Sequence, residues 1–260
     1  MDLGLTGKRA LVMGSTAGIG RGIAETLAAE GAAVALCGRR DAKPIADEIA
    51  GRTGTTARGY RLDLADDASV AALIAAVDND FRGVDIVVLN GGGPPPGGVL
   101  GVEPAVWEAQ FRPMFLNQVK IATAFLAGMR QRRWGRILVT SSSGAVQPIP
   151  ALGISNTLRA SLLSWAKSIS SEIAADGVTV NTVLPGRIQT DRVDEIDAAA
   201  AKRQNMSVED VVRSSLAAIP MGRYGTVDEY ARVCVFLVSA CAAYVTGTVV
   251  RVDGGYIRAI

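Results

Sequence analysis

Apolar residues follow two alternating patterns along this chain. Short, mostly apolar runs predict buried strands at 8–13, 33–37, 57–62, 84–89, 136–140, 178–183 and 248–252. Between them, apolar residues recur every three or four positions, which predicts helices at 19–30, 42–50, 67–81, 104–132, 151–175, 191–204, 207–217 and 227–239. Strands that alternate with helices favour a parallel sheet covered on both faces. We therefore expect an α/β fold, a three-layer doubly wound parallel sheet of about seven strands.

Composition narrows the class of protein. The 260 residues show no change of composition, so residues 1–260 are predicted to form a single domain. A net charge of +2 gives no reason to expect a nucleic-acid partner. The sequence has neither a membrane-spanning apolar run nor a secretory signal at its start, and we expect a cytoplasmic protein with no membrane partner. Three cysteines without metal-ligand spacing fit a reducing compartment and are interpreted as buried hydrophobic residues.

The chain contains no histidine. This excludes hydrolase triads and zinc sites that need imidazole, and we predict no metal site. Any general acid or base must come from another titratable side chain or from a water molecule.

A glycine-rich turn joins the first predicted strand to the first helix. It reads Gly-Ser-Thr-Ala-Gly-Ile-Gly over residues 14–20. Glycines at this place let backbone N–H groups approach a diphosphate at a helix N-terminus, where the helix dipole favours an anion. The spacing differs from the general Gly-x-Gly-x-x-Gly pattern, so its position between strand and helix is what favours a dinucleotide site over an ordinary tight turn.

The end of the second strand indicates which dinucleotide would bind. Arg39 and Arg40 stand where an acidic residue would bind the ribose 2′-hydroxyl of NAD. Arginine accommodates the 2′-phosphate instead, so NADP is favoured over NAD; a solvated arginine pair is the alternative. Asp63, after the third strand, is a candidate to accept a hydrogen bond from the adenine amine or to cap the next helix.

The order of these motifs resembles the short-chain dehydrogenase/reductase family over nearly the whole chain. The matching pieces are residues 14–20, 63–64, 90–92, 141–142, 181, 185–186, 190, 245–247 and 253–255. The resemblance implies a Rossmann-like fold, a nicotinamide cofactor, a small-molecule substrate and a homo-oligomer, either dimer or tetramer. With the turn and the two arginines, the implied cofactor-binding residues are Gly14, Ser15, Thr16, Gly18, Ile19, Gly20, Arg39, Arg40, Asp63, Leu64, Asn90, Gly91, Gly92, Arg159, Pro185, Gly186, Ile188 and Thr190.

The chain departs from the family at its catalytic positions. Members of the family usually use Asn, Ser, Tyr and Lys, and the last two form Tyr-x-x-x-Lys on one helix. Counting from neighbouring motifs places Met114 at the Asn position, Ser155 at the Tyr position and Arg159 at the Lys position; Ser142 is retained. Asn117, one helical turn after Met114, is a candidate to replace the missing amide, or else a helix-cap or surface residue.

These substitutions change the available chemistry. A serine hydroxyl is a much weaker acid than a phenol, while arginine keeps the positive charge but does not readily release a proton. Ser142, Ser155, Arg159 and Asn117 are therefore the candidate catalytic residues, with electrostatic stabilisation favoured over acid–base chemistry; a solvated helix start is the alternative for Ser155. We expect an oxidoreductase that reduces a ketone, 3-oxoacyl or similar. The alternatives are an NADP-binding sensor or partner subunit without catalysis, and a non-redox enzyme.

By the same resemblance, residues 191–207 correspond to the substrate lid. The two long helices that start near Pro104 and Ala151 correspond to a subunit interface.

Overall fold

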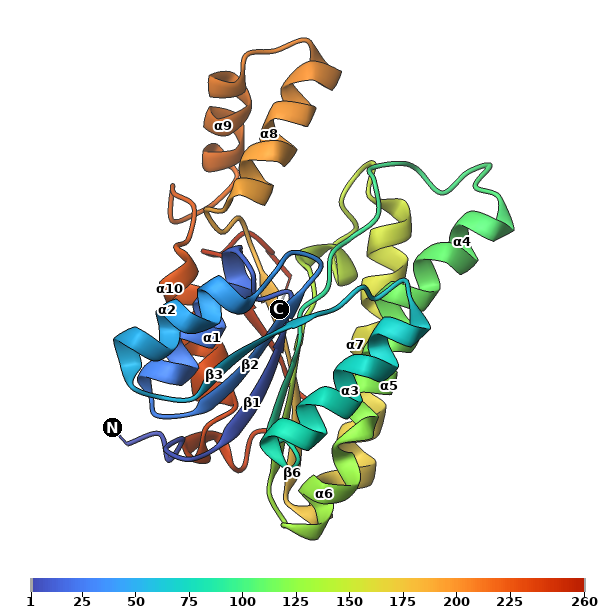
Figure 1. Ribbon diagram of the computed structural model, residues 1–260. Coiled ribbons are helices and arrows are strands. Elements are labelled where there is room, and N and C mark those ends of the chain that lie inside the picture. Colours follow the sequence, from blue (N-terminus) through green and yellow to red (C-terminus); the bar gives the residue numbers. More distant parts are fainter. Residues whose placement is uncertain (1, 260) are drawn as a thin grey trace.

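The computed structural model describes residues 2–259. Within this range, seven strands form one sheet in the order β3-β2-β1-β4-β5-β6-β7, with every neighbouring pair parallel. The predicted doubly wound α/β fold is confirmed (Figure 1). The strands are β1 (Arg9–Met13), β2 (Ala33–Gly38), β3 (Ala57–Arg61), β4 (Ile86–Leu89), β5 (Gly135–Thr140), β6 (Val178–Pro185) and β7 (Val249–Val252).

Helices cover both faces of the sheet. One face carries α1 (Gly18–Ala29), α2 (Lys43–Thr53) and α10 (Val227–Leu237), and the other carries α3 (Asp67–Phe81), α5 (Asn117–Ala124) and α7 (Gly153–Ile173) (Figure 1). Side chains of a strand alternate between the faces. In β1, Val12 packs into the core beneath α1, while Leu11 and Met13 pack into the core beneath α3.

The prediction of one continuous helix over residues 104–132 is wrong. It is divided into α4 (Pro104–Phe111), a π-helical turn (Arg112–Leu116), α5 and α6 (Leu126–Gln131). Pro113 lies in the π-helical turn and has no N–H with which to continue an α-helical hydrogen-bond ladder. The Gln118 side chain is buried and donates to the carbonyl oxygens of Pro113 and Met114, at 3.3 and 3.0 Å. These contacts satisfy backbone groups that the irregular turn leaves free.

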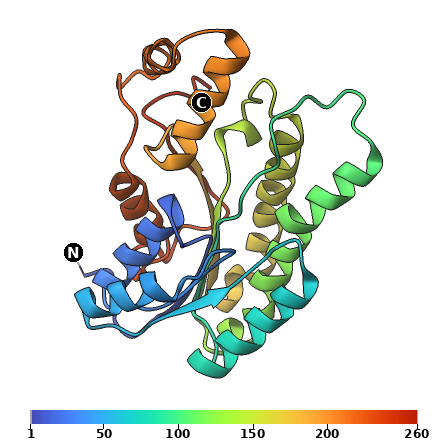
Figure 2. The same ribbon diagram turned by 45° about the horizontal axis from the view of Figure 1, so that its top comes forward.

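The carboxyl ends of all the strands lie at one edge of the sheet, because every pairing is parallel. The chain order reverses between β1 and β4, and such a switch point leaves a crevice outside the strand ends. The hairpin formed by α8 (Asp191–Gln204) and α9 (Val208–Ala217) stands beyond this edge (Figures 1 and 2). A ligand bound in the crevice would therefore lie below the hairpin.

Two expectations from composition can also be compared with the structure. Among residues 2–259, no helix has both the length and the apolar character that a membrane span requires. Cys37 and Cys234 are buried as expected, and burial raises the pKa of the Cys37 thiol to about 12. The expectation was wrong for Cys241, which is exposed and follows the end of α10 in a short 3₁₀ turn.

Candidate active site

The turn between β1 and α1 is closed so tightly that its glycine positions do not accept a side chain without strain. Gly14 and Gly18 have positive φ angles of 58° and 54°, which L side chains rarely adopt. A Cβ atom on Gly20 would lie 2.2 Å from the carbonyl oxygen of Gly14. Backbone N–H groups at the N-terminus of α1 are therefore accessible to an anion. The turn has the form of a phosphate cradle.

Ser15 holds this turn against the sheet. Its side chain is buried, and its Oγ donates to the carbonyl oxygen of Val12 at 2.7 Å and accepts from the N–H of Cys37 at 2.9 Å. The hydroxyl thus joins β1 to β2 and does not point outward. Thr16 and Ile19 are half-buried on the same turn.

Asn90 and Gly91 hold the turn from the other side of the crevice. The Asn90 Nδ2 donates to the carbonyl oxygens of Met13 and Gly14 at 3.2 and 3.3 Å. A Cβ on Gly91 would lie 2.7 Å from the Gln118 Nε2, so the chain after β4 passes close to α5. The loops after β1 and β4 therefore form one connected floor.

Arg39 and Arg40 lie at the carboxyl end of β2, beside the glycine turn. Both side chains are exposed. A Cβ on the preceding Gly38 would lie 3.0 Å from the Thr16 Cγ2, so the strand end and the turn are in contact. Two cations next to a phosphate cradle suit a second phosphate group.

Asp63 follows β3 at the same edge of the sheet. Its Oδ1 accepts a hydrogen bond from the N–H of Ala65 at 2.9 Å. The cap of α3 is Asp66, which accepts from the N–H of Ala68 at 2.9 Å, so the helix-cap alternative for Asp63 is wrong. The other Asp63 oxygen accepts no hydrogen bond from the residues that the structure describes.

Asn117 is buried in α5 and is neither a helix cap nor a surface residue. Its Nδ2 donates to the carbonyl oxygen of Leu64 and to the Asp67 Oδ1, both at 2.9 Å. Both amide hydrogens are thereby used to tie α5 to the start of α3. The structure does not bring this side chain together with Ser142, Ser155 and Arg159.

Arg159 is buried in α7 and joins the ends of two strands, β4 and β5, through three carbonyl oxygens. Its Nη2 donates to the carbonyl oxygens of Gly91 and Gly92 at 2.8 and 3.0 Å, and its Nη1 donates to that of Thr140 at 3.3 Å. Burial lowers the pKa of the Arg159 guanidinium to about 10. The group still carries its charge near neutral pH, so the crevice contains a fixed cation.

Ser155 lies close to this cation, and Ser142 lies at the carboxyl end of β5. Ser155 is half-buried one turn before Arg159 on α7. A Cβ on Gly93 would lie 3.7 Å from the Ser155 Oγ and 3.9 Å from the Arg159 Nη2, so these three residues meet. Ser142 follows β5, and its Oγ accepts from the N–H of Gly144 at 3.1 Å. Its hydroxyl proton remains available to an acceptor in the crevice.

Two loops form a wall beside these serines. The Asn156 side chain accepts from the N–H of Ile149 at 3.3 Å and donates to its carbonyl oxygen at 2.9 Å. The N–H of Gly97 donates to the carbonyl oxygen of Ala151 at 2.7 Å, and the N–H of Gly153 donates to that of Gly97 at 2.9 Å. The proline-rich segment after β4 is thus paired with the segment that precedes α7.

Residues 185–190 lead from β6 to α8. A Cβ on Gly186 would lie 2.5 Å from the Cα of Asp253, so this segment passes close to the chain after β7. The Thr190 Cγ2 lies 3.4 Å from where a Cβ on Gly18 would be. The start of α8 therefore touches the phosphate cradle.

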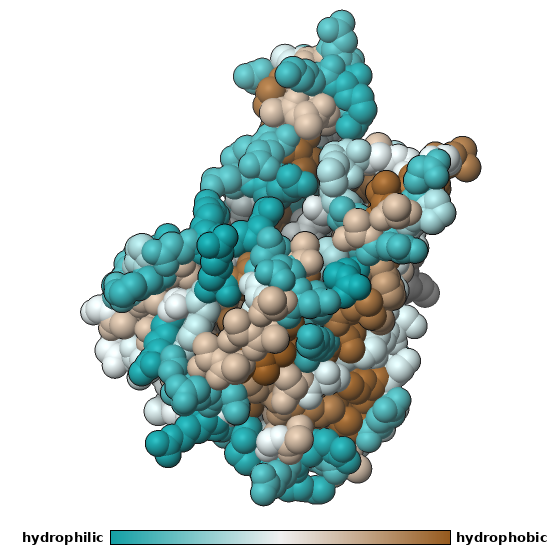
Figure 3. Space-filling model, turned by 45° about the vertical axis from the view of Figure 1, so that its right-hand side comes forward, coloured by the Kyte–Doolittle hydropathy of each residue, from teal (hydrophilic) through white to brown (hydrophobic). Residues whose placement is uncertain are grey.

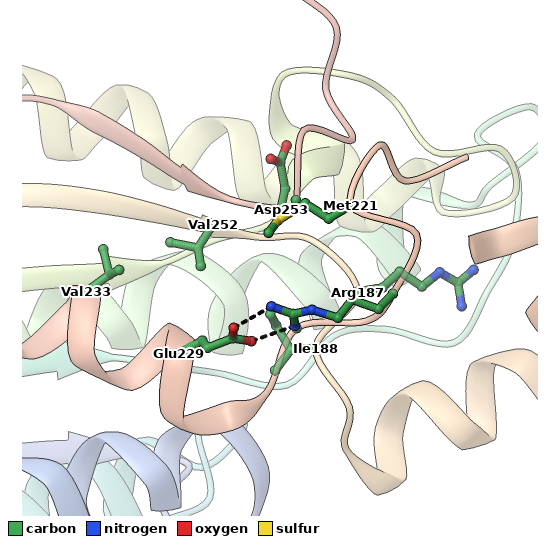
Figure 4. A pocket seen from close by; sticks show the side chains of 10 residues that line it. Arg187, Ile188, Met221, Glu229, Val233, Val252 and Asp253 are labelled. Carbon is green, nitrogen blue, oxygen red and sulfur yellow. Dashed lines mark hydrogen bonds and ion pairs between the residues drawn. The ribbon is translucent and has the colours of Figure 1, made fainter. Parts of the chain in front are cut away.

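A separate cavity of about 230 Å³ lies below the α8–α9 hairpin, next to α10 (Figure 4). Its lining includes Ile188 and Gly225, which pair as a short parallel bridge, and the ion pair of Arg223 with Glu229 at 2.6 Å. Hydrogen bonds from Arg223 and from the backbone lower the pKa of Glu229 to about 2. These two charges neutralise each other at the cavity wall.

Sequence reasoning missed several residues that shape the site. Gly93 and Asn156 have no motif of their own, and their roles depend on contacts with residues that are distant in sequence or on another element. Gln118, which supports the floor, lies in α5 and binds carbonyl oxygens of the irregular turn that periodicity did not indicate. The run of glycines and prolines after β4 was the one available signal, because consecutive prolines fix the path of a chain.

Comparison with known proteins places the chain in a family. The family model described as enoyl-(acyl carrier protein) reductase matches residues 14–257. The chain belongs to the short-chain dehydrogenase/reductase family. It is 34% identical to the 3-oxoacyl-[acyl-carrier-protein] reductase FabG of Aquifex aeolicus, over 98% of this chain and 99% of that protein. It is 32% identical to the D-beta-hydroxybutyrate dehydrogenase of Cupriavidus necator, over 97% and 99%.

A solved structure of this family has the same architecture. L-sorbose reductase from Gluconobacter frateurii, in complex with NADPH and L-sorbose, matches with a TM-score of 0.93 and 30% identity, covering 100% of both chains.

Proposed function

We propose that this chain is an NADP-dependent oxidoreductase that reduces a carbonyl group, of the 3-oxoacyl type or a similar ketone. The observation that carries the proposal is the meeting of a phosphate cradle, two exposed arginines and the group formed by Ser142, Ser155 and Arg159 at one edge of the sheet. The reductases among its relatives and the NADPH complex of a structural neighbour support the same assignment.

The residues present fit an NADP molecule. Because Gly14, Gly18 and Gly20 carry no Cβ, the turn packs closely on itself and on Asn90, and backbone N–H groups at the N-terminus of α1 would bind a diphosphate there. Arg39 and Arg40 would bind the 2′-phosphate. When bound, the nucleotide supplies a hydride. Other residues proposed to line it are Thr16, Ile19, Asp63, Leu64, Asn90, Gly91, Gly92, Pro185, Gly186, Ile188 and Thr190.

We infer that the chain is a divergent member of its family, with Met114, Ser155 and Arg159 at three of the usual catalytic positions. Ser142 and Ser155 would donate hydrogen bonds to the carbonyl oxygen of the substrate. The buried Arg159 cation would stabilise the negative charge that develops on that oxygen. Because a serine hydroxyl is a poor acid, the proton that completes the reaction would come from water. Asn117 is left out of this set because both its amide hydrogens are used elsewhere.

One observation favours a second candidate, a nucleotide-binding subunit without catalysis. The Arg159 guanidinium donates to three backbone carbonyl oxygens, which makes it a structural link between β4, β5 and α7. In that case the residue would hold the crevice open for the nucleotide and nothing would be reduced.

We propose that residues 1–260 form one domain and that the protein assembles as a homodimer or homotetramer. We also propose a cytoplasmic location. Figure 3 shows apolar side chains gathered on the side of the molecule that carries α4 and α5. Val106 and Leu116, from α4 and the π-helical turn, are exposed hydrophobic residues. A second copy of the chain is a suitable cover for such a surface.

The first test is direct. Purified protein is titrated with NADPH and NADH by fluorescence or calorimetry, and a panel of 3-oxoacyl thioesters and other ketones is then screened for NADPH consumption. We expect NADPH to bind more tightly and at least one ketone to be reduced. Binding of NADPH without turnover on the whole panel would favour the non-catalytic candidate, and no nucleotide binding would contradict both.

The second test restores the usual pair of residues. Ser155→Tyr combined with Arg159→Lys should raise kcat on the best ketone by about a hundredfold, since a positioned general acid typically contributes that much. The single variant Ser155→Tyr is the control, because Arg159 would remain tied to its three carbonyls. A folded double variant that binds NADPH and reduces no ketone would contradict the proposed role of these positions.

A further inference from the structure

The α8–α9 hairpin stands on a narrow base. Its own apolar core consists of small side chains, Ala200, Ala201 and Val211. Figures 1 and 2 both show the hairpin standing clear of the sheet and joined to it at one end. The cavity of about 230 Å³ lies at this joined end, so packing there is incomplete. Apolar contacts alone give little reason for the hairpin to keep one orientation.

A buried carboxylate at the base of the hairpin makes directional contacts that the apolar packing there does not provide. Asp197 lies in the middle of α8 and is 1% exposed, whereas most of the helix is polar and open to solvent. The Arg187 Nη1 pairs with its Oδ1, and the Tyr224 hydroxyl donates to its Oδ2 at 2.8 Å. The Arg187 guanidinium also lies over the Tyr224 ring, 5.8 Å from its centre. Both carboxylate oxygens thus have a donor.

Asp197, Arg187 and Tyr224 together connect α8 to the two chain segments at the base of the hairpin. Arg187 precedes α8, and Tyr224 follows α9, so the two partners belong to the two chain segments that enter and leave the hairpin. Those segments are paired beside them, with the N–H of Gly225 donating to the carbonyl oxygen of Arg187 at 2.9 Å. Asp197 fastens the first two turns of α8 to this pair. Charge-assisted hydrogen bonds in a buried place are strong and directional, so they fix an angle as well as a contact.

We propose that Asp197 is a positioning residue that, through Arg187 and Tyr224, sets the angle of the α8–α9 hairpin over the substrate side of the crevice. The inference rests on the proposed reductase function. Thr190, at the start of α8, keeps its contact with the cradle at Gly18, and the angle sets where the rest of α8 lies over the crevice. A hairpin released from this link would still leave the cradle intact. Substrate would then bind more weakly while the nucleotide binds as before.

The test compares Asp197→Asn with Glu195→Gln. Glu195 lies two residues away on α8, is exposed, and has an ion pair only with Arg192 within the described chain. In Asp197→Asn, the side-chain N–H₂ would face either the Arg187 guanidinium or the Tyr224 hydroxyl, which now donate to the carboxylate. One of these two hydrogen bonds would therefore be lost. We expect KM for the best ketone to rise about tenfold, with kcat and the Kd for NADPH within about twofold, as one buried charged hydrogen bond commonly accounts for such a factor. Glu195→Gln should match the parent.

A second readout does not depend on activity. Hydrogen exchange of the α8 backbone amides should be about tenfold faster in Asp197→Asn than in Glu195→Gln, because local opening follows the loss of a local link. Should Asp197→Asn fail to fold, Tyr224→Phe is the second variant, since it removes one donor and keeps the ion pair. It should raise KM for the ketone and the exchange rate of the α8 amides by about threefold each. Unchanged exchange in α8 would overturn the proposal. If the parent protein reduces no ketone, the proposed function fails while the exchange measurement still decides whether the link exists.

One further variant separates positioning from stability. Arg187→Met combined with Asp197→Asn removes both charges, so no buried charge is left unpaired and stability should recover relative to Asp197→Asn alone. We expect KM to stay raised about tenfold in the double variant, since the link is still absent. Recovery of KM together with stability would overturn the positioning role.

Discussion

Around the glycine turn, the fold is held by close backbone approach, whereas around the α8–α9 hairpin it is held by a few paired side chains. At the turn, an added Cβ on Gly20 would meet a carbonyl oxygen at 2.2 Å, and Ser15 and Asn90 use their polar atoms on the backbone. At the hairpin, Asp197 and Glu229 each have a guanidinium partner next to a cavity. The glycine positions of the first region have no space for an added side chain, whereas the second region borders a cavity.

This difference fits a division of labour, because the relatives named above have names that refer to different substrates. A rigid cradle would hold the proposed diphosphate in one place. A hairpin joined by a small number of polar links can change its contacts without disturbing the sheet. Substitutions at the two regions should therefore differ in kind.

The largest expected effect is at the cradle. Gly20→Ala should weaken NADPH binding at least about a hundredfold and lower the free energy of unfolding by about 1–3 kcal/mol, because backbone atoms that cannot move aside meet the new methyl group. Titration calorimetry and urea unfolding measure the two quantities. The matched control is Gly51→Ala in α2, where nothing lies within 4 Å of the added Cβ. That variant should be slightly more stable than the parent, and normal NADPH binding by Gly20→Ala would contradict the cradle.

The next effect concerns which nucleotide is preferred. Arg39→Asp should weaken NADPH binding by about tenfold or more while leaving NADH binding unchanged or improved, because a charged hydrogen bond to the 2′-phosphate is replaced by repulsion. Fluorescence titration with both nucleotides gives the ratio. Arg203→Asp, the same change of charge near the end of the exposed hairpin, is the control. Equal loss for the two nucleotides would argue against a 2′-phosphate site at Arg39.

A smaller effect is expected at the wall beside the serines. Asn156→Ala removes both hydrogen bonds to Ile149 and should lower the free energy of unfolding by about 1–2 kcal/mol. It should also raise KM for ketones several-fold, with Kd for NADPH unchanged. Thr157→Ala, at the next and exposed position, is the control in the same steady-state assay. An unchanged KM would mean that this wall does not contact substrate.

The smallest expected effect is a dependence of stability on pH, which comes from Glu229 at the base of the hairpin. The pKa of Glu229 is lowered from the ordinary 4.5 to about 2 in the folded protein. A lowered carboxylate pKa gives a contribution to stability that is complete above about pH 4.5 and is lost as the pH falls toward 2. Glu229→Gln should therefore show a flatter loss of stability than the parent across that interval in acid unfolding followed by circular dichroism. Parallel curves would show that the carboxylate is not held by Arg223 in solution.

The same two regions show how far the sequence alone could lead. The succession of strands and helices along the chain and the position of the glycine turn were predictable, because apolar periodicity and glycine spacing are local properties of the chain. Most predicted strands and helices begin and end within a few residues of the observed ones. Asn117 could not be placed by counting from Met114, since an irregular turn intervenes and the partners of its amide lie in α3 and the loop before it. The sequence did not distinguish Asp197 from the other acidic residues of a polar helix, because both of its partners lie outside α8.

The π-helical turn at Arg112–Leu116 gives this helix one residue more than a regular α-helix between the same two ends would contain. Deleting a single amino acid there would therefore let the helix run on regularly, while α4 and α5 keep nearly their present directions. The side chains within the turn, that of Met114 among them, would change direction, and the carbonyl oxygens that Gln118 now binds would enter the regular hydrogen-bond ladder. Deletions are usually tolerated in loops, but in this protein a helix could absorb the loss of one codon by losing its irregular turn.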